Sequence, residues 1–183
     1  MKAKIALLSG DGIGPEIMVQ GVEVLNTIAE KYNHEFIYRE GLIGGAAIDA
    51  TGIPYPDDTH ELCLNADAIL FGAIGDPKYD NNPSATVRPE QGLLAMRKKL
   101  GLYANLRPVR TFPSLFDKSP LKSDRLEGVD FMVVRELTGG IYFGQPSEID
   151  EEGMNSVDTC LYSKDEILRA ARIAFELAGN SRN

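Results

Sequence analysis

Residues 4–17, KIALLSGDGIGPEI, join a short apolar run, a glycine-rich turn and the start of a helical pattern. The apolar run is typical of a buried strand, and Pro15 stands where a helix accepts proline, in its first turn. Further strand-like and helical stretches follow in alternation, at 35–39, 57–65, 68–71 and 90–100. Because strands that alternate with helices pair in parallel, the sequence predicts an α/β fold.

The composition excludes several classes of protein. The chain has 183 residues, of which 43% are hydrophobic and 25% charged, and its formal net charge is −8. The acidic balance argues against non-specific nucleic-acid binding, which requires Lys and Arg. Cys63 and Cys160 are too few for a disulfide framework or a zinc site. The sequence shows neither a signal-peptide core nor an apolar stretch near the roughly 20 residues of a membrane span. We therefore expect a cytoplasmic protein with no nucleic-acid or membrane partner.

The pattern changes after residue 102, and we expect a second domain there. The residues before it include a long loop at 72–89, and loops of that length are usually functional or disordered. In the second part we expect strands at 103–109, 131–134 (buried) and 141–143 and a protruding polar loop at 144–156. A helix is expected at 163–178, with Ser163 as its N-cap. The predicted domains are 1–102 and 103–183, with the boundary near 100–108.

The turn GDGIGP at 10–15 has two interpretations. Glycine-rich turns at a helix N-terminus bind the phosphates of dinucleotides. Here the spacing is G-x-G-x-G, not G-x-G-x-x-G, and Glu40 is only a weak candidate for the ribose partner. A structural turn, with Asp11 and Glu16 near the positive end of the helix dipole, is the favoured interpretation.

Three arginines at the ends of apolar segments, Arg97, Arg107 and Arg135, suggest a site for a di- or polycarboxylate. Guanidinium groups bind carboxylates through two parallel hydrogen bonds. Arg135 directly follows the predicted strand 131–134, and residues beyond the carboxyl ends of parallel strands line the binding crevice of α/β sheets. The alternative is that these arginines are solvated side chains.

Two further features remain open on the residues alone. Glu90, Leu93, Leu94 and Arg97 follow the i, i+3, i+4, i+7 spacing of one helix face. The leucines then belong either to a binding surface or to the core, with Arg97 at the rim. Tyr142 is either an ordinary strand aromatic or a phenol that passes a proton.

Four segments together carry a resemblance to a known family: GDGIGPEI at 10–17, LFGAIGDPKYD at 70–80, RPEQGLLAMRKKLGLYANLRPV at 88–109 and RELTGGIYFGQP at 135–146. In order and spacing they resemble the isocitrate/isopropylmalate dehydrogenases, which are β-decarboxylating dehydrogenases. The resemblance implies the two-domain α/β fold of that family, incomplete in this chain. Residues 1–102 would be the cofactor side, and 103–183 the first part of the second domain with a dimer arm at about 144–162.

The resemblance also implies an activity. The family oxidises a malate-type substrate with hydride transfer to NAD and then releases a carboxylate as CO₂, with Mg²⁺ or Mn²⁺ polarising the substrate oxygen. By position, Arg97, Arg107 and Arg135 match the arginines that hold the substrate carboxylates, and Tyr142 matches the tyrosine that helps to protonate the enol. The residues matching the nicotinamide side of NAD are Asp76, Pro77, Lys78, Tyr79, Asp80 and Glu90.

The substrate implied by the resemblance is (2R,3S)-3-isopropylmalate, as used in leucine biosynthesis by a homodimer. Leu93 and Leu94 match the apolar wall that meets the isopropyl group, where isocitrate dehydrogenases have polar residues. Alternatives are a related alkylmalate or tartrate dehydrogenase, or a non-catalytic carboxylate-binding fragment. Family members are longer, and their catalytic lysine, metal-binding aspartates and adenine-binding segment have no match here. We therefore expect no metal ligands in this chain, and a fragment that is inactive alone.

Overall fold

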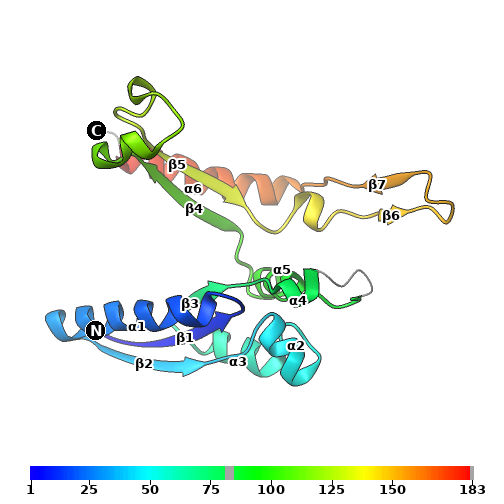
Figure 1. Ribbon diagram of the computed structural model, residues 1–183, viewed down its shortest axis with the longest axis horizontal. Coiled ribbons are helices and arrows are strands. Elements are labelled where there is room, and N and C mark those ends of the chain that lie inside the picture. Colours follow the sequence, from blue (N-terminus) through cyan, green and yellow to red (C-terminus); the bar gives the residue numbers. More distant parts are fainter. Residues whose placement is uncertain (81–84, 182–183) are drawn as a thin grey trace. The chain divides into compact units, whose positions relative to one another are not determined.

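The computed structural model describes residues 1–80 and 85–181 and divides the chain into two units, Met1–Leu100 and Gly101–Asn183. The elements of both units are labelled in Figure 1. None of the helices in these described ranges combines the length and the apolar character that crossing a membrane demands.

The first unit is built on a three-stranded parallel sheet. Strand β1 (Lys2–Gly10) lies in the centre, between β2 (Glu35–Glu40) and β3 (Ala68–Ala73). The central position explains the apolar run at its heart, where Ala6 and Leu8 are fully buried. The predicted parallel α/β arrangement is confirmed.

Helices cover both faces of this sheet, and the alternation of side chains along β1 divides the core between them. On one face, α1 (Gly14–Tyr32) brings Met18 against Ile5 and Leu7. The opposite face carries Ala6 and Leu8. They share a core with residues on or beside α3 (Asp57–Leu64) and α5 (Pro89–Lys99), namely Tyr55, Cys63 and Met96, and with Ile43 of the segment after β2.

Two short helices were not predicted. Helix α2 (Gly45–Thr51) follows Gly44, whose φ of 74° is a backbone conformation that side chains with a Cβ rarely adopt. Helix α4 (Pro77–Asp80) interrupts the long loop expected at 72–89. Positions 81–84 of that loop lie outside the described residues.

The second unit is built on an antiparallel ladder between β4 (Ala104–Arg110) and β5 (Asp130–Glu136), with α6 (Lys164–Ser181) packed against β5. Two 3₁₀ turns, η1 (Pro113–Lys118) and η2 (Ser123–Arg125), lie between the strands. The predicted burial of 131–134 is wrong, because Phe131 and Val133 are 50% and 41% exposed. The predicted place of Arg135 beyond the end of a parallel strand is also wrong, since β5 pairs antiparallel and includes Arg135 within the strand.

The segment after β5 differs from the predicted strand and loop. Residues 141–143 do not form a strand; the chain makes a 3₁₀ turn there, η3 (Gly140–Tyr142). The polar loop expected at 144–156 is largely a hairpin of β6 (Ser147–Ile149) and β7 (Ser156–Asp158), which extends away from the β4–β5 ladder (Figure 1).

The predicted cap of the last helix is confirmed. The Glu166 amide donates to Ser163 Oγ over 3.3 Å, and the Ser163 amide donates to Glu166 Oε2 over 2.7 Å. This reciprocal pair is a capping box, which satisfies two amides that the start of a helix otherwise leaves unpaired.

Candidate carboxylate-binding site

Arg107 and Arg135 lie on the same face of the β4–β5 ladder. The register pairs Arg107 with Val133 and Asn105 with Arg135, and directly opposite residues point to the same side of a sheet. The two arginines are therefore diagonal neighbours. Arg107 Nε donates to Asn105 Oδ1 over 2.5 Å. This face can present two guanidinium groups to one anion.

Tyr142 joins this face from η3. Its side chain is 62% exposed, and the Cζ atom of Arg135 lies 5.8 Å from the centre of its ring, within the range of a cation–π contact. Tyr142 is therefore not the strand aromatic of the alternative interpretation. The structure brings together three of the predicted residues, Arg107, Arg135 and Tyr142.

The residue after Arg135 points the other way. Glu136 is nearly buried, with a side chain 10% exposed. Its carboxylate accepts hydrogen bonds from the amides of Thr138 and Gly139, each over 2.8 Å, and from Thr138 Oγ1. Arg169 Nη2 of α6 donates to Glu136 Oε1 over 3.1 Å. Burial acts to raise the pKa of Glu136, but these hydrogen bonds outweigh it, and the pKa lies below its ordinary value.

Arg169 links this carboxylate to an aromatic ring. Its guanidinium carbon lies 4.8 Å from the centre of the Tyr103 ring. Glu136, Thr138 and Arg169 were not predicted as site residues. The Thr-Gly-Gly turn after an acidic residue was a local signal, but the partner 33 positions later leaves no trace in local sequence.

In the first unit, helix α5 separates the predicted residues by their burial. Pro89, Gly92 and Met96 form its buried face. Leu93 packs against the core beneath the sheet, as the core interpretation predicts. Leu94 is also half-buried but is not among the described residues that pack there. Arg97 is half-buried. The two leucines therefore differ, and Leu94 is the one free of a core role.

The predicted cofactor-side residues Asp76, Pro77, Lys78, Tyr79 and Asp80 form α4 and its first turn. The Lys78 amide donates to Asp76 Oδ1 over 2.9 Å. Glu90 comes close to this segment, because a Cβ built on Gly75 would lie 3.5 Å from Glu90 Oε1. Glu90 therefore lies close to the residue before Asp76, at the start of the segment 76–80 that was predicted with it as the cofactor side.

Helix α2 holds the segment 76–80 through Asp49, which was not predicted as a site residue. Lys78 Nζ lies 2.5 Å and Tyr79 Oη 2.8 Å from Asp49 Oδ1. Hydrogen bonds from Lys78 and then Tyr79 lower the pKa of Asp49. No local pattern marks Asp49, because it lies on a seven-residue helix without a clear apolar period.

Asp11 of the glycine-rich turn is a structural clamp. It is 4% exposed and accepts the amides of Gly45 and Ala46 over 2.8 Å, and that of Gly75 over 3.3 Å. The prediction placed Asp11 near the positive, N-terminal end of the first helix, and its side chain accepts hydrogen bonds from the first amides of α2. Asp11 thereby ties the turn after β1 to α2 and to the segment after β3.

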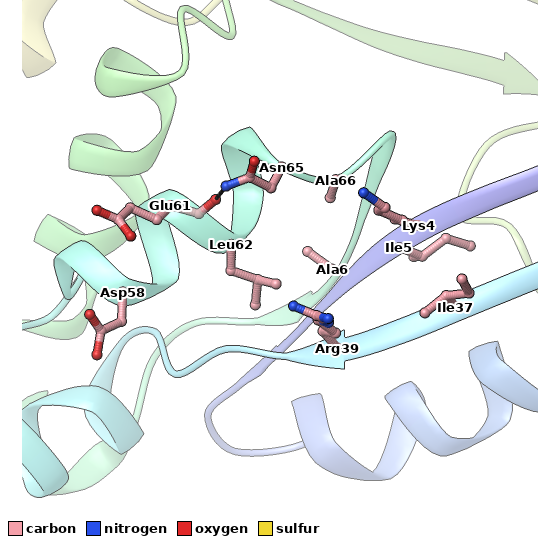
Figure 2. Close-up of a pocket in the computed structure, with 10 residues that line it drawn as sticks. All are labelled: Lys4, Ile5, Ala6, Ile37, Arg39, Asp58, Glu61, Leu62, Asn65 and Ala66. Atoms are coloured by element: carbon pink, nitrogen blue, oxygen red, sulfur yellow. Dashed lines mark hydrogen bonds between the residues drawn. The ribbon is translucent and has the colours of Figure 1, made fainter.

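A hollow of about 520 Å³ lies elsewhere in the first unit. Figure 2 shows Ala6 and Arg39 of the sheet facing Leu62 of α3 across it. Its charged lining is mixed, with Lys4 and Arg39 against Asp58 and Glu61. None of the predicted site residues lines it. In the described ranges, no three His, Cys, Asp or Glu side chains are grouped so as to hold a metal ion.

This chain belongs to the isocitrate/isopropylmalate dehydrogenase family, whose family model matches residues 4–183. It is 54% identical to the 3-isopropylmalate dehydrogenase of Bacteroides fragilis strain YCH46, covering 100% of this chain and 51% of that protein. It is 58% identical to the enzyme of the same name from Bacillus licheniformis, covering 97% of this chain and 49% of that protein. The chain thus spans about half the length of the curated relatives it matches.

Solved structures agree with this assignment. An isocitrate dehydrogenase from Methylococcus capsulatus matches 98% of this chain and 48% of its own, with a TM-score of 0.74 and 26% identity. A β-decarboxylating dehydrogenase from Thermococcus kodakarensis matches 97% and 46%, with a TM-score of 0.62 and 31% identity. The predicted family and the predicted α/β fold are confirmed, and this chain spans about half of each of these solved chains.

Proposed function

We propose that this chain is the N-terminal portion of an enzyme that oxidatively decarboxylates (2R,3S)-3-isopropylmalate with hydride transfer to NAD. The observation that carries the proposal is the gathering of Arg107, Arg135 and Tyr142 on one face of the β4–β5 ladder. The names of the relatives, at 54% and 58% identity, support the choice of substrate. The reaction would serve leucine biosynthesis in the cytoplasm.

In this proposal the arginines bind the two carboxylates of the substrate. Arg107 and Arg135 are diagonal neighbours, so their planar guanidinium groups can grip the two ends of one diacid. Arg97 stays a substrate-binding residue that the family resemblance predicts. Holding the carboxylate that leaves as CO₂ in a fixed orientation lowers the entropic part of the barrier.

Tyr142 would handle the proton that the product requires. Its phenol is exposed on the arginine face, where a bound diacid would lie beside it. After the carboxylate is lost, the enol must gain a proton on carbon, and a positioned phenol can deliver one.

The family resemblance assigns the apolar wall for the isopropyl group to Leu93 and Leu94, and we favour Leu94. It is half-buried and lies outside the core cluster, whereas Leu93 packs into it. Matching a branched alkyl group in this way discriminates by about 1–3 kcal/mol. Isocitrate would instead place a third carboxylate there, and a charge without a partner is costly to desolvate.

The residues that the structure describes fit NAD but form no metal site. Asp76, Asp80 and Glu90 place negative charge around one segment, which suits the positively charged nicotinamide end. When bound, NAD accepts the hydride. The described residues offer no group of three metal ligands. We expect the ligands of Mg²⁺ or Mn²⁺ to come from outside residues 1–80 and 85–181.

A homodimer is part of the proposal. All residues of β6 and β7 are exposed, and Ile149 and Val157 show 71% and 48% of their surface. A two-stranded hairpin is at best marginally stable in water without further packing. The predicted arm at 144–162 would gain that packing from a second subunit.

The test is turnover by the complete gene product. We expect kcat/KM for 3-isopropylmalate with NAD to exceed that for isocitrate or tartrate, and a preference for isocitrate would overturn the substrate. A related alkylmalate dehydrogenase would prefer a different alkyl chain. A carboxylate-binding module without activity would bind 3-isopropylmalate in calorimetry but reduce no NAD when Mg²⁺ is added.

A further inference from the structure

The arginine face depends on a chain reversal after β5. Tyr142 follows Arg135 by seven positions, yet its ring lies against the guanidinium of Arg135. The chain must therefore turn back tightly between them. The turn passes through Gly140, whose φ is 78° and whose hypothetical Cβ would lie 2.4 Å from the Tyr162 hydroxyl oxygen. Only glycine fits this position.

Two anchors hold the reversal. On one side, the Gly140 amide donates to the Leu161 carbonyl oxygen over 2.8 Å, next to the start of α6. On the other side, the Glu136 carboxylate accepts hydrogen bonds from the amides of Thr138 and Gly139. Arg169 completes the second anchor, since its Nη2 atom donates both to Glu136 Oε1 and to Thr138 Oγ1.

Glu136 is covalently next to Arg135, and their side chains leave the strand on opposite faces. A shift of the Glu136 backbone is therefore also a shift of Arg135. The same carboxylate orders the turn that leads to Tyr142. Its nearly complete burial means that water cannot replace these hydrogen bonds without the turn moving.

We propose that Glu136 and Arg169 are positioning residues, which hold Tyr142 against Arg135 by fixing the turn at 136–140. They act through these two residues and do not touch the substrate. The inference rests on the proposed function, because that function makes Arg135 a substrate-binding residue and Tyr142 a proton donor. Errors of about 1 Å in the placement of a reacting group can cost around a hundredfold in rate.

The test is Glu136→Gln in the complete gene product, made both alone and with Tyr142→Phe. Alone, we expect kcat to fall roughly 10- to 100-fold and KM to rise through Arg135. Together with Tyr142→Phe, we expect little further loss of kcat, because the residue being positioned has already lost its hydroxyl. Equal fold losses in both backgrounds would mean that Glu136 acts independently of Tyr142, and would overturn the proposal.

Amide hydrogen exchange gives a readout that does not need activity. Glu136→Gln should accelerate exchange at the amides of Thr138 and Gly139. The Leu137 amide, which donates to the Tyr103 carbonyl oxygen over 2.9 Å, serves as an internal control and should change much less. Uniform acceleration at all three amides, or none at Thr138 and Gly139, would contradict the proposed anchor.

Further variants distinguish the loss of the anchor from misfolding and from a general effect of changed charge. Thr138→Val preserves shape and removes only the hydroxyl, so it should show a milder form of the same pattern. Arg169→Lys should retain more activity than Arg169→Met. The matched control is Asp130→Asn, which removes an exposed ion pair with Arg110 on the same ladder and should change neither kcat nor exchange.

The two proposals fail in different ways. If the unchanged gene product turns over no malate-type substrate, the proposed function is wrong, and hydrogen exchange still decides whether Glu136 anchors the turn. If turnover is normal and the losses from Glu136→Gln and Tyr142→Phe multiply, the proposed function stands and the positioning role is wrong.

Discussion

The guanidinium carbon of Arg135 lies 5.8 Å from the centre of the Tyr142 ring, and both side chains belong to the same unit as Arg107. A cation above an aromatic face is favourable, more so where water is excluded. The contact keeps the flat guanidinium in a defined orientation, with its remaining N–H groups available to a carboxylate.

Arg135→Lys should weaken substrate binding. Lysine keeps the charge but loses the planar fork and the contact of the guanidinium with the Tyr142 ring. Because hydrogen bonds to charged groups contribute about 1.5–3 kcal/mol, we expect KM for the dicarboxylate to rise roughly 10- to 100-fold. Steady-state kinetics on the complete gene product measure this. Arg110→Lys, on the opposite face of the same ladder, is the control, and similar effects of both changes would count against the site.

Leu94→Asn and Leu93→Asn should separate specificity from stability. Leu94→Asn should reduce the preference for 3-isopropylmalate over unbranched malate by about 1–3 kcal/mol in the ratio of kcat/KM values. Leu93→Asn should instead lower the free energy of unfolding by about 1–3 kcal/mol, since it places a polar group against the core. If Leu94→Asn leaves the substrate ratio unchanged, the apolar wall lies elsewhere.

Asp11→Ala should loosen two segments at once. The buried carboxylate accepts the amides of Gly45, Ala46 and Gly75, and removing it leaves them without that acceptor. We expect a loss of about 2–4 kcal/mol in unfolding free energy, with faster exchange at these three amides. Glu35→Gln, in an exposed ion pair with Lys2, should change stability by less than about 1 kcal/mol.

Gly44→Ala should destabilise the same clamp from the other side. The residue has a φ of 74°, and a Cβ there would lie 2.3 Å from Asp11 Oδ2. Either the turn or the carboxylate must move. A thermal midpoint equal to that of the unchanged protein would show that the clamp tolerates this displacement.

The stability of the second unit should depend on pH through Glu136. Its pKa is lowered in the folded protein, so between the folded value and the ordinary value of 4.5 the unfolded chain binds more protons. The contribution of Glu136 is present above pH 4.5 and is lost as pH falls through the folded pKa. Urea unfolding between pH 7 and pH 3 should therefore show a stability gap between the unchanged protein and Glu136→Gln that narrows on acidification. A gap independent of pH would contradict this.

Elements that depend on interactions between residues close in sequence were predicted correctly. The strand at the centre of the first sheet follows from an apolar run, and the cap of α6 follows from Ser163 and Glu166. Helix α2 escaped prediction because its residues, GAAIDAT, show no apolar period and it begins after a glycine. Its position is set by Asp11, which is 34 residues distant from Gly45.

The candidate site was predictable in its residues but not in its geometry. Arginines after apolar segments indicated an anion site, and the family resemblance selected Tyr142. An apolar stretch such as 131–134 does not reveal how much of it neighbouring elements cover, and these strand residues are largely exposed. Ile141 to Phe143 looked like a strand, but the close approach of Gly140 to Tyr162 bends the chain into a turn.

Because Arg135 and Glu136 alternate along β5, the register between β4 and β5 decides which of the two charges faces the ligand. Slipping the two strands by one residue would exchange their faces. Glu136 would then replace Arg135 on the ligand side. Arg135 would lie beneath α6 without a counter-ion. Misaligned molecules would bind dicarboxylates more weakly, because Glu136 would stand in place of Arg135 on the face of Arg107. Anion affinity therefore reports whether β4 and β5 pair in their native register.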